Sequence, residues 1–540
     1  MDAQDVGAKA AGSVYGRHRR VRANLEAFSM AVLMAVLLKY FAVEAYQIPT
    51  SSMQPTMMGS PTAGVMERVL VDKIAYEIRE PARFDVAVFR YPVRHRQNYV
   101  KRILGMPGDR LHIAGGNVYV AAPDVDRARL FADLTRLTPL RRPPKVQAEL
   151  WRELYPLRRE VTGATTALNT FFSPQGGQWR EEGESLRVSA AKGSLVRLSY
   201  YDAAHQGLSN QIWDGYPVEM GRKLKEEDDG LRRQALGRGQ FMPLEAVQDA
   251  RISFTLLPSQ SPQLDVEITV SGKDRKPLRF ALEVREGKGT LKGYLAGKQE
   301  LASAPFEFAL PAGRATEVAF AHVDDLLVAW HEGTMVAELE CGVLKTLEDM
   351  TIPNTRADAA ITLRDAGDAV FTDLRVEADQ HWTRGSLERN HLIEVPAGHY
   401  FMMGDNTLAS ADSREWTEIT VGVTDDGRMV DPRTPGARAI SGNKRPVPAE
   451  NPPDVDENPI PIRSRERVVF EDEIGEIRVL RAKTSGAYSP QNMLFGEPGQ
   501  EWHPPERRLP FVRREHMLGR ALVGFWPIPP FGPNRAHVIR

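Results

Sequence analysis

Cysteine is almost absent from the sequence, because Cys341 is the one thiol among 540 residues. A single cysteine excludes an intrachain disulfide and also the paired cysteines of CxxC redox and zinc motifs. An excess of one charge is missing too, since 71 Asp and Glu residues balance 70 Lys and Arg residues. The overall charge therefore gives no reason to expect a nucleic-acid partner. Hydrophobic residues make up 42% of the chain, which is ordinary for globular protein, and the length predicts two or three folded units.

Long apolar runs are also scarce, and residues 27–43 form the one that stands out. Basic residues stand just before it, namely Arg17, His18, Arg19, Arg20 and Arg22. This order is typical of a membrane helix whose N-terminus stays in the cytoplasm. The run is shorter than the roughly 20 residues of a spanning helix, and Val43-Glu44-Ala45 resembles the cleavage triplet of a signal peptide. On this pattern a membrane anchor and a cleaved signal peptide are both open.

Strand signals follow the apolar run. Apolar and polar residues alternate over residues 68–89 and 99–120, with a hairpin predicted at Gly115-Gly116-Asn117, and this period of two predicts a β-rich unit. Residues 121–250 are mixed and give no fold assignment.

Alternation returns in residues 251–380 and predicts an inserted β-sandwich of many short strands. The run around Trp330-His331-Glu332-Gly333 resembles the concanavalin-like jelly rolls of lectins and laminin-G modules, which implies protein or carbohydrate as the ligand of this insert. A purely structural insert whose tryptophans lie in the core is the interpretation that the residues favour, since no ligand residues stand out. Residues 417–510 are predicted to be a loop-rich insertion, because residues 436–462 are rich in Pro, Asn and acidic residues.

Three short runs carry the candidate chemistry. The first, Ile48-Pro49-Thr50-Ser51-Ser52-Met53-Gln54-Pro55-Thr56-Met57, brackets hydroxyl groups between prolines directly after the apolar run. The second, Tyr99-Val100-Lys101-Arg102-Ile103-Leu104-Gly105-Met106-Pro107-Gly108-Asp109, places a lysine among apolar neighbours. The third is Tyr400-Phe401-Met402-Met403-Gly404-Asp405-Asn406, continued by Ser410-Ala411-Asp412-Ser413-Arg414. Each run alone is more typical of a turn, a linker or a strand end, but the three together in this order are specific.

In this order the three runs resemble the bacterial type I signal peptidases, the family of leader peptidases with a Ser/Lys dyad. The resemblance implies that Ser52 is the nucleophile and Lys101 the general base. It further implies that the N–H of Ser52 and the hydroxyl of Thr50 stabilise the oxyanion. Ser410 would orient the lysine amine, and Asp412 and Arg414 would form a supporting ion pair. No metal or organic cofactor is implied.

A lysine base needs an unusual environment. An ordinary lysine has a pKa of about 10.4 and carries a proton at neutral pH. Burial among apolar groups lowers this value by up to about 3 to 5 units. The sequence therefore predicts that Lys101 is buried beside Val100 and Ile103. Ser-Lys pairs of this kind are a known variant of the serine-protease constellation.

The predicted fold class is mainly β, with an antiparallel β catalytic domain of the signal-peptidase type, an N-terminal transmembrane helix and an inserted jelly-roll-like sandwich. The expected units are listed in chain order: 1–24 cytoplasmic N-terminus, 25–45 transmembrane helix, 46–120 first part of the catalytic domain, 121–250 insertion of unassigned fold, 251–380 inserted sandwich, 390–416 second catalytic part, 417–510 loop-rich insertion, and 511–540 C-terminal strand and tail.

Two residues depart from the family pattern: Phe84 stands at a common glycine, and Thr407 stands where an arginine often follows Gly-Asp-Asn. Neither change removes a catalytic atom.

The resemblance predicts a membrane-bound serine protease of the plasma (inner) membrane, with its catalytic domain on the extracytoplasmic or periplasmic side. Its partners would be membrane lipid and secretory preproteins, whose signal peptides it removes after small-x-small sites during protein secretion. Two alternatives remain. One is a self-cleaving Ser-Lys repressor protease, for which the sequence shows no DNA-binding module. The other is an inactive, membrane-tethered binding protein that uses the inserted domain.

Overall fold

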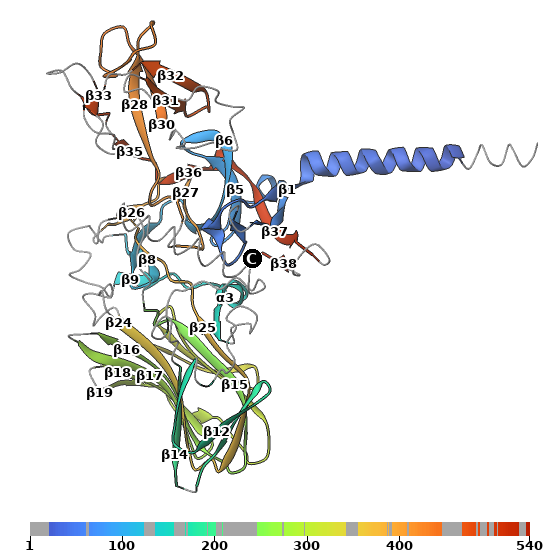
Figure 1. Ribbon diagram of the computed structural model, residues 1–540, viewed down its shortest axis with the longest axis vertical. Helices are drawn as coiled ribbons and strands as arrows, with labels where there is room; N and C mark the ends of the chain where they lie inside the picture. Colours follow the sequence, from blue (N-terminus) through green and yellow to red (C-terminus); the bar gives the residue numbers. More distant parts are fainter. Residues whose placement is uncertain are drawn as a thin grey trace, which may run out of the picture.

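The computed structural model describes most of the chain. The described residues are 21–60, 64–123, 136–155, 168, 171–191, 193–200, 208, 246–272, 275–295, 298–341, 355–385, 387, 391–407, 410–444, 467–481, 484–485, 494–495, 502–504, 506–528 and 536–539. The fold is mainly β, as the sequence predicts. Figure 1 shows a central group of sheets, with a large domain at one end and a smaller module at the other.

A helix over residues 21–37 projects from the central sheets (Figure 1). It passes through one π-turn, η1 (Leu38–Ala42), into strand β1 (Val43–Gln47). The prediction of helix up to residue 45 is therefore wrong at its end. Val43 has an extended backbone and pairs with Asp72 of the neighbouring strand. Because a β-branched residue favours a strand and a partner strand is available here, the helix ends before Val43.

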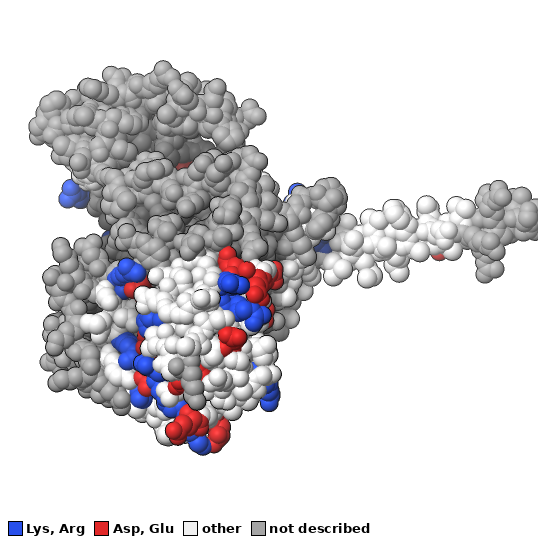
Figure 2. Space-filling view, turned by 60° about the horizontal axis from the view of Figure 1, so that its bottom comes forward, with Lys and Arg blue, Asp and Glu red and all other residues white. Residues whose placement is uncertain are grey.

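The projecting helix carries its apolar side chains on the outside. Leu25, Phe28 and Met30 are each about two-thirds exposed, at 66%, 68% and 67%. In Figure 2 the helix is accordingly almost white, whereas charged side chains of both signs are scattered over the large domain. Among the helices that the structure describes, none combines the length and the apolar character needed to cross a membrane.

The central sheet is antiparallel and has the strand order β1-β4-β37-β5-β6-β27-β36, with β38 paired to β37. Its strands are β4 (Arg68–Asp72), β5 (Val86–Tyr91), β6 (Arg94–Gly105), β27 (His399–Met403), β36 (Phe511–Arg513), β37 (Met517–Trp526) and β38 (His537–Val538). Strand β27 pairs directly with β6, although about 300 residues separate them in the chain. The second and third motif runs therefore lie side by side.

Smaller elements complete the central region. A four-stranded sheet has the order β26-β7-β8-β9, and its β7–β8 hairpin confirms the turn predicted at Gly115-Gly116. Its strands are β7 (Arg110–Ala114), β8 (Asn117–Ala121), β9 (Leu137–Pro139) and β26 (Ile393–Glu394). The other elements here are η2 (Ser51–Met53), β2 (Gly59–Ser60), β3 (Val65–Met66), α2 (Ala75–Ile78), α3 (Pro144–Leu150) and η6 (Arg514–His516).

The large domain, here called the sandwich, consists of two eight-stranded sheets. The first has the order β12-β13-β25-β15-β21-β22-β23, with β10 paired to β25. These strands are β10 (Arg152–Tyr155), β12 (Gln178–Glu182), β13 (Ser185–Ser189), β15 (Ala250–Pro258), β21 (Thr316–Val323), β22 (Leu326–His331), β23 (Thr334–Glu340) and β25 (Asp368–Ala378). The second has the order β11-β14-β24-β16-β17-β18-β19, with β20 paired to β18. These strands are β11 (Phe172–Gln175), β14 (Leu195–Tyr200), β16 (Gln263–Gly272), β17 (Arg275–Arg285), β18 (Lys288–Leu295), β19 (Lys298–Ala302), β20 (Phe306–Glu307) and β24 (Thr355–Arg364).

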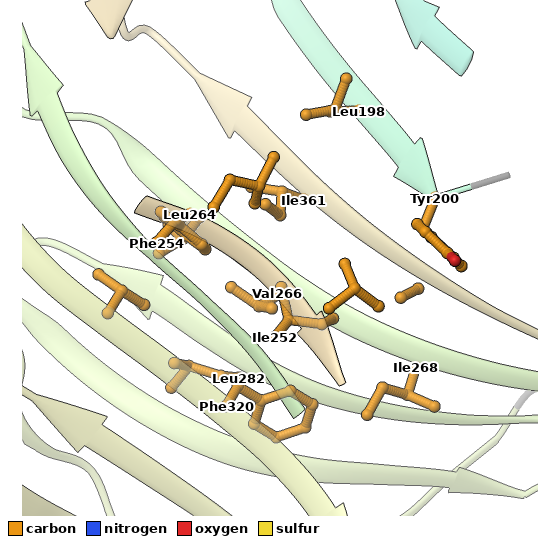
Figure 3. Packing of buried hydrophobic residues seen from close by; sticks show 14 of the residues in the cluster. Leu198, Tyr200, Ile252, Phe254, Leu264, Val266, Ile268, Leu282, Phe320 and Ile361 are labelled. Atoms are coloured by element: carbon orange, nitrogen blue, oxygen red, sulfur yellow. The ribbon is translucent and has the colours of Figure 1, made fainter. Parts of the chain in front are cut away.

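Both sheets of the sandwich contribute to one hydrophobic core. Figure 3 shows Phe254 and Phe320 of the first sheet packed with Leu264 and Leu282 of the second. The predicted start of this domain at residue 251 is too late, because β10 to β14 belong to the same two sheets. Strands such as β12 bury few side chains and contain charged residues. Their sequence therefore lacks the alternation of apolar and polar residues that predicts a strand. The jelly-roll topology stays a prediction.

The small module at the other end is a sheet with the order β29-β28-β30-β31-β32, with β35 paired to β28. Its strands are β28 (Thr417–Val423), β29 (Met429–Val430), β30 (Arg438–Lys444), β31 (Arg467–Asp472), β32 (Ile477–Arg481) and β35 (Glu506–Arg508), and β33 (Thr484–Ser485) pairs with β34 (Leu494–Phe495). The prediction of a loop from residue 436 is wrong for β30, which gains a partner strand on each side. Residues 445–462 of that predicted loop lie outside the described residues.

Phe84 shows how a departure from the family glycine is tolerated. Its backbone has φ +70°, a conformation that favours glycine. Its ring is 4% exposed and packs in a core cluster with Leu104 and Phe401. Burial of the ring thus offsets the backbone strain.

Substitution at Phe84 separates these two effects. We expect Phe84→Ala to lower the free energy of unfolding by about 3–5 kcal/mol, because it loses the ring and keeps the strain. Phe84→Gly should be less damaging than Phe84→Ala by about 1 kcal/mol, because glycine adopts positive φ freely. Denaturant unfolding of both variants tests this. An alanine variant as stable as the glycine variant would show that the backbone conformation costs nothing here.

Candidate active site

Ser52 lies in a short buried turn between β1 and β2. Thr50 has an extended backbone and precedes the 3-10 turn η2, which contains Ser52. The turn is anchored by Met53, which is fully buried in a cluster with Val69 and Val86 of the central sheet. Ser52 itself is 8% exposed. The apolar residues around the hydroxyl-rich run therefore fix the backbone that carries the hydroxyl group.

Lys101 reaches Ser52 from the middle of β6. Its Nζ lies 2.6 Å from Oγ of Ser52 and donates a second hydrogen bond to the carbonyl of Val100 at 3.1 Å. The side chain is buried, and β6 is held in place by pairing with β5, where Ala87 lies opposite Lys101. The structure thus brings together two predicted residues that are 49 positions apart in the chain.

The environment of Lys101 favours its neutral form. Burial lowers the pKa of Lys101 to about 8, while the carboxylates of Asp412 and Asp405 act in the opposite direction and Arg414 lowers it further. Removing an ammonium group from water disfavours the charged state. A substantial fraction of the lysine is therefore neutral near pH 8 and able to accept a proton from the adjacent hydroxyl.

Thr50 lies beside the same hydroxyl. Its Oγ1 is 3.3 Å from Oγ of Ser52. This places a second hydroxyl group next to the candidate nucleophile, where it can donate a hydrogen bond to a charge that develops on a neighbouring oxygen.

The loop over residues 404–407, here called the supporting loop, forms hydrogen bonds to the backbone of the Ser52 turn. The N–H of Asn406 donates to the carbonyl of Ser52 at 3.1 Å, and its side-chain amide donates to the carbonyl of Ser51 at 3.1 Å. Asp405 accepts two hydrogen bonds of 2.8 Å from Arg102 of β6, and both side chains are at most 1% exposed. Sequence reasoning gave no individual role to Arg102, Asp405 or Asn406, although all three lie within the motif runs.

Asp412 and Arg414 form the predicted ion pair. Two hydrogen bonds of 2.7 Å join them, and Asp412 also accepts the N–H of Gly404 at 3.1 Å. Burial opposes ionisation of Asp412, but the adjacent Arg414 and these hydrogen bonds hold its pKa below the ordinary value. The pair thus ties residue 414 to the start of the supporting loop.

Ser410 lies close to the site but does not form the hydrogen bond to Lys101 that the sequence predicts. A Cβ atom added at Gly404 would lie 2.2 Å from Oγ of Ser410 and 2.3 Å from the carbonyl oxygen of Ser52, so only glycine fits between them. The Ser410 hydroxyl lies near the carboxylate of Asp412 and helps to lower the pKa of Asp412, but among the described residues it makes no hydrogen bond to Lys101. The expected hydrogen bond from Ser410 to Lys101 is therefore not formed in this structure.

Thr407, the second departure from the family pattern, has partners of its own. Its Oγ1 accepts the N–H of Thr383 at 2.9 Å and a hydrogen bond from Arg414 at 3.0 Å. The threonine thus links the supporting loop to the chain that leaves the sandwich. The sequence gives no sign of this contact, because Thr383 lies between the predicted domains.

Two groups of described side chains have the composition of metal ligands. They are Asp249, Asp324 and Asp379, and His322, Asp325 and Cys341, with ligand atoms within 4.8 Å of one another in each group. The guanidinium of Arg142 donates hydrogen bonds to Asp324 and Asp379, so a positive charge of the protein already lies between two carboxylates of the first group. Burial opposes a charge on His322, but Asp249 raises the pKa of His322 well above its ordinary value, and a protonated imidazole is not a ligand. Neither group contains Ser52 or Lys101, and the expectation of a cofactor-free reaction stays a prediction.

Comparison with known proteins matches parts of the chain to one protein family. The family model described as signal peptidase, peptidase S26 matches residues 21–158 and 352–429. Over these parts the chain is similar to the type I signal peptidases. A probable signal peptidase I-2 of Synechocystis sp. is 35% identical over 101 residues, which cover 18% of this chain and 44% of that protein. Signal peptidase I of Pseudomonas aeruginosa is 38% identical over 96 residues, covering 16% of this chain and 32% of that protein. In both comparisons the chain spans less than half the length of the other protein.

Solved structures also match the chain in part. The carbohydrate-binding module CBM66 from Bacillus subtilis is 10% identical, with a TM-score of 0.23, and the match covers 39% of this chain and 96% of that chain. Sheep galectin-11 is 12% identical, with a TM-score of 0.18, and the match covers 24% of this chain and 90% of that chain. These scores assign neither a fold nor a ligand to the sandwich.

Proposed function

We propose that the chain is a membrane-bound serine endopeptidase that removes N-terminal signal peptides from exported preproteins after small-x-small sites. The observation that carries this proposal is the 2.6 Å contact between Nζ of Lys101 and Oγ of Ser52 in a buried site. Proximity of a hydroxyl nucleophile to a base of lowered pKa is the arrangement that acyl transfer requires. The relation to the type I signal peptidases supports the same substrate class.

The reaction would proceed through an acyl-enzyme. Neutral Lys101 accepts the proton of Ser52 as Oγ attacks the scissile carbonyl carbon, and the N–H of Ser52 and the hydroxyl of Thr50 donate hydrogen bonds to the oxyanion. Protonated Lys101 gives its proton to the leaving amine of the mature protein, and the C–N bond breaks. Water then transfers a proton to Lys101 and attacks the ester. Protonated Lys101 returns this proton to Oγ of Ser52 as the ester C–O bond breaks, which restores the Ser52 hydroxyl and neutral Lys101 and releases the signal peptide, whose new carboxyl group ionises in water.

The substrate would bind as an extended strand. Ser52 follows β1, which is the edge strand of the central sheet and pairs with β4 on one side. An exposed strand edge can accept a peptide as an additional strand, and alternate side chains then enter pockets on one face. Small residues before the cleavage site fit the dense packing around Ser52, which is itself mostly buried.

We further propose that the projecting helix and η1, which follow each other without a break over residues 21–42, together cross the plasma membrane, with residues 1–24 on the cytoplasmic side and the catalytic sheets on the other side. The outward apolar side chains of the helix, such as Leu25, Phe28 and Met30, support contact with lipid. The basic residues that precede the helix support this orientation. Flotation with lipid vesicles would test the contact: full-length protein should float with the vesicles, and protein that stays at the bottom of the gradient would exclude it.

Cleavage of a preprotein with an Ala-x-Ala site tests the enzymatic proposal. We expect detergent-solubilised wild-type protein to cut at that site, because the dyad is assembled. Ser52→Ala and Lys101→Ala should each lose at least about 1,000-fold in kcat, in line with removal of a nucleophile or base in other proteases. Circular dichroism checks that both variants remain folded. An inert wild-type protein, or a Lys101→Ala variant that cuts as fast as wild type, would favour the binding-protein alternative.

The pH dependence of the reaction tests the role of Lys101 separately. The base must be neutral, and burial lowers its pKa to about 8. The value of kcat/KM should therefore rise with pH, reach half of its maximum near pH 8 and fall about tenfold for each pH unit well below that point. Initial rates between pH 5.5 and about 10 give the curve. An acidic limb centred at the ordinary lysine value of about 10.4 would contradict a desolvated base.

A further inference from the structure

The chain that leaves the sandwich is buried along its whole length. Residues Asp379, Gln380, His381, Trp382 and Thr383, here called the seam segment, follow β25 directly, and none is more than 6% exposed. Flexible linkers between domains are normally exposed and polar. The seam segment instead packs against the central sheets. The N–H of Trp382 donates to the carbonyl of Gly116 at 2.7 Å, for example, and the Trp382 ring joins the cluster that contains Phe84.

Both ends of the sandwich meet at one atom of the supporting loop. Gln380 donates a hydrogen bond from its side-chain amide to the carbonyl of Asp405 at 2.7 Å. Arg152, at the start of β10, donates both to the same carbonyl and to the side-chain oxygen of Gln380. The register of β10 with β25 places Arg152 opposite Ala378, which explains why the two side chains converge.

The peptide group that they hold is the one that contacts the nucleophile turn. The carbonyl of Asp405 and the N–H of Asn406 belong to the same planar unit. Its carbonyl end is held by Gln380 and Arg152, and its N–H end donates to the carbonyl of Ser52 at 3.1 Å. Rotation of this peptide would break the bonds at both ends together. The orientation of the Asp405–Asn406 peptide therefore transmits the position of the sandwich to the backbone of Ser52.

The side chain of Asp405 cannot replace these donors. Its carboxylate is already bound to Arg102 and Thr56, and the residue is fully buried. Loss of Gln380 or Arg152 would leave the carbonyl with fewer partners away from water, which favours a rotated peptide. On the other side of the loop, Thr383 of the seam segment bonds to Thr407, so the sandwich contacts the loop at two points.

We propose that Gln380 and Arg152 are positioning residues for the Ser52 nucleophile. Through these two residues the sandwich helps to fix the geometry of the catalytic site. This proposal rests on the proposed function, since it concerns the same reaction. It does not depend on any ligand of the sandwich. It assigns a role in catalysis to residues that lie outside the three motif runs.

Substitution of Gln380 tests the proposal. Gln380→Leu keeps the size of the side chain and removes its amide. We expect a fall of about tenfold in the single-turnover rate constant measured with saturating enzyme in excess, which corresponds to one hydrogen bond of ordinary strength. That constant does not depend on the fraction of molecules that is folded. The KM and the midpoint of the acidic limb should stay unchanged, because neither substrate binding nor Lys101 is touched.

Gln178→Leu is the matched control, because Gln178 is an exposed residue of β12 in the same sandwich. It should cleave like wild type. If wild type cuts the preprotein and Gln380→Leu has the same single-turnover rate constant, the positioning role is refuted while the proposed function stands. If wild type does not cut at all, the proposed function itself fails.

Arg152 provides a second and independent pair of variants. Arg152→Lys keeps a donor near the carbonyl of Asp405 and should retain activity within about threefold of wild type, whereas Arg152→Met should lose about tenfold. A residue that serves stability alone would lower the melting temperature without this difference in the single-turnover rate constant. Equal rate constants for the lysine and methionine variants would overturn the proposal, even if Gln380→Leu fails to fold.

Discussion

Desolvation of one amino group is the constraint on which the site depends. Lys101 is buried and hydrogen-bonds to Ser52 and to a backbone carbonyl rather than to a carboxylate. A carboxylate in direct contact would stabilise the ammonium form and abolish the base. The loss of water is therefore the main source of the lowered pKa. The surrounding structure has to keep water away from Nζ and leave room for one hydroxyl group beside it.

The two ion pairs near the dyad are consistent with this constraint. Asp405 and Asp412 are the acids whose charges raise the pKa of Lys101, and each is bound in a bidentate contact to an arginine. Arg102 and Arg414 thus offset the negative charge that would otherwise act on the lysine. Buried ion pairs contribute little net stability, because desolvation cancels most of the attraction. Their value here is electrostatic neutrality around the base together with a fixed geometry for the supporting loop.

Much of the site was predictable because its chemistry is local in sequence. The runs that contain Ser52, Lys101 and Asp412 can be read directly, and pairing of β6 with β27 brings two of them together. The contacts of Gln380, Arg152 and Thr383 could not be predicted, since they depend on how the end of a domain lies against a distant loop. The fold follows the same division. Alternation predicts the strands of the sandwich core, whereas charged edge strands such as β12 and the end of the N-terminal helix at Val43 are decided by partners in space.

The pairing of Arg152 with Ala378 has a consequence for how the chain folds. The first and last strands of the sandwich lie next to each other. Once the sandwich has folded, the two chain segments that enter and leave it are therefore held close together, as they would be by a short loop. The entropy of closing a chain increases with the number of flexible residues between the contacts. An unfolded insert would separate Lys101 from Asp405 by a long, costly loop, whereas a folded one makes β6 and β27 near neighbours. Completion of the sandwich should therefore precede the pairing of β27 with β6, and a newly made chain would gain the loop that holds the Ser52 turn only after its largest domain is in place.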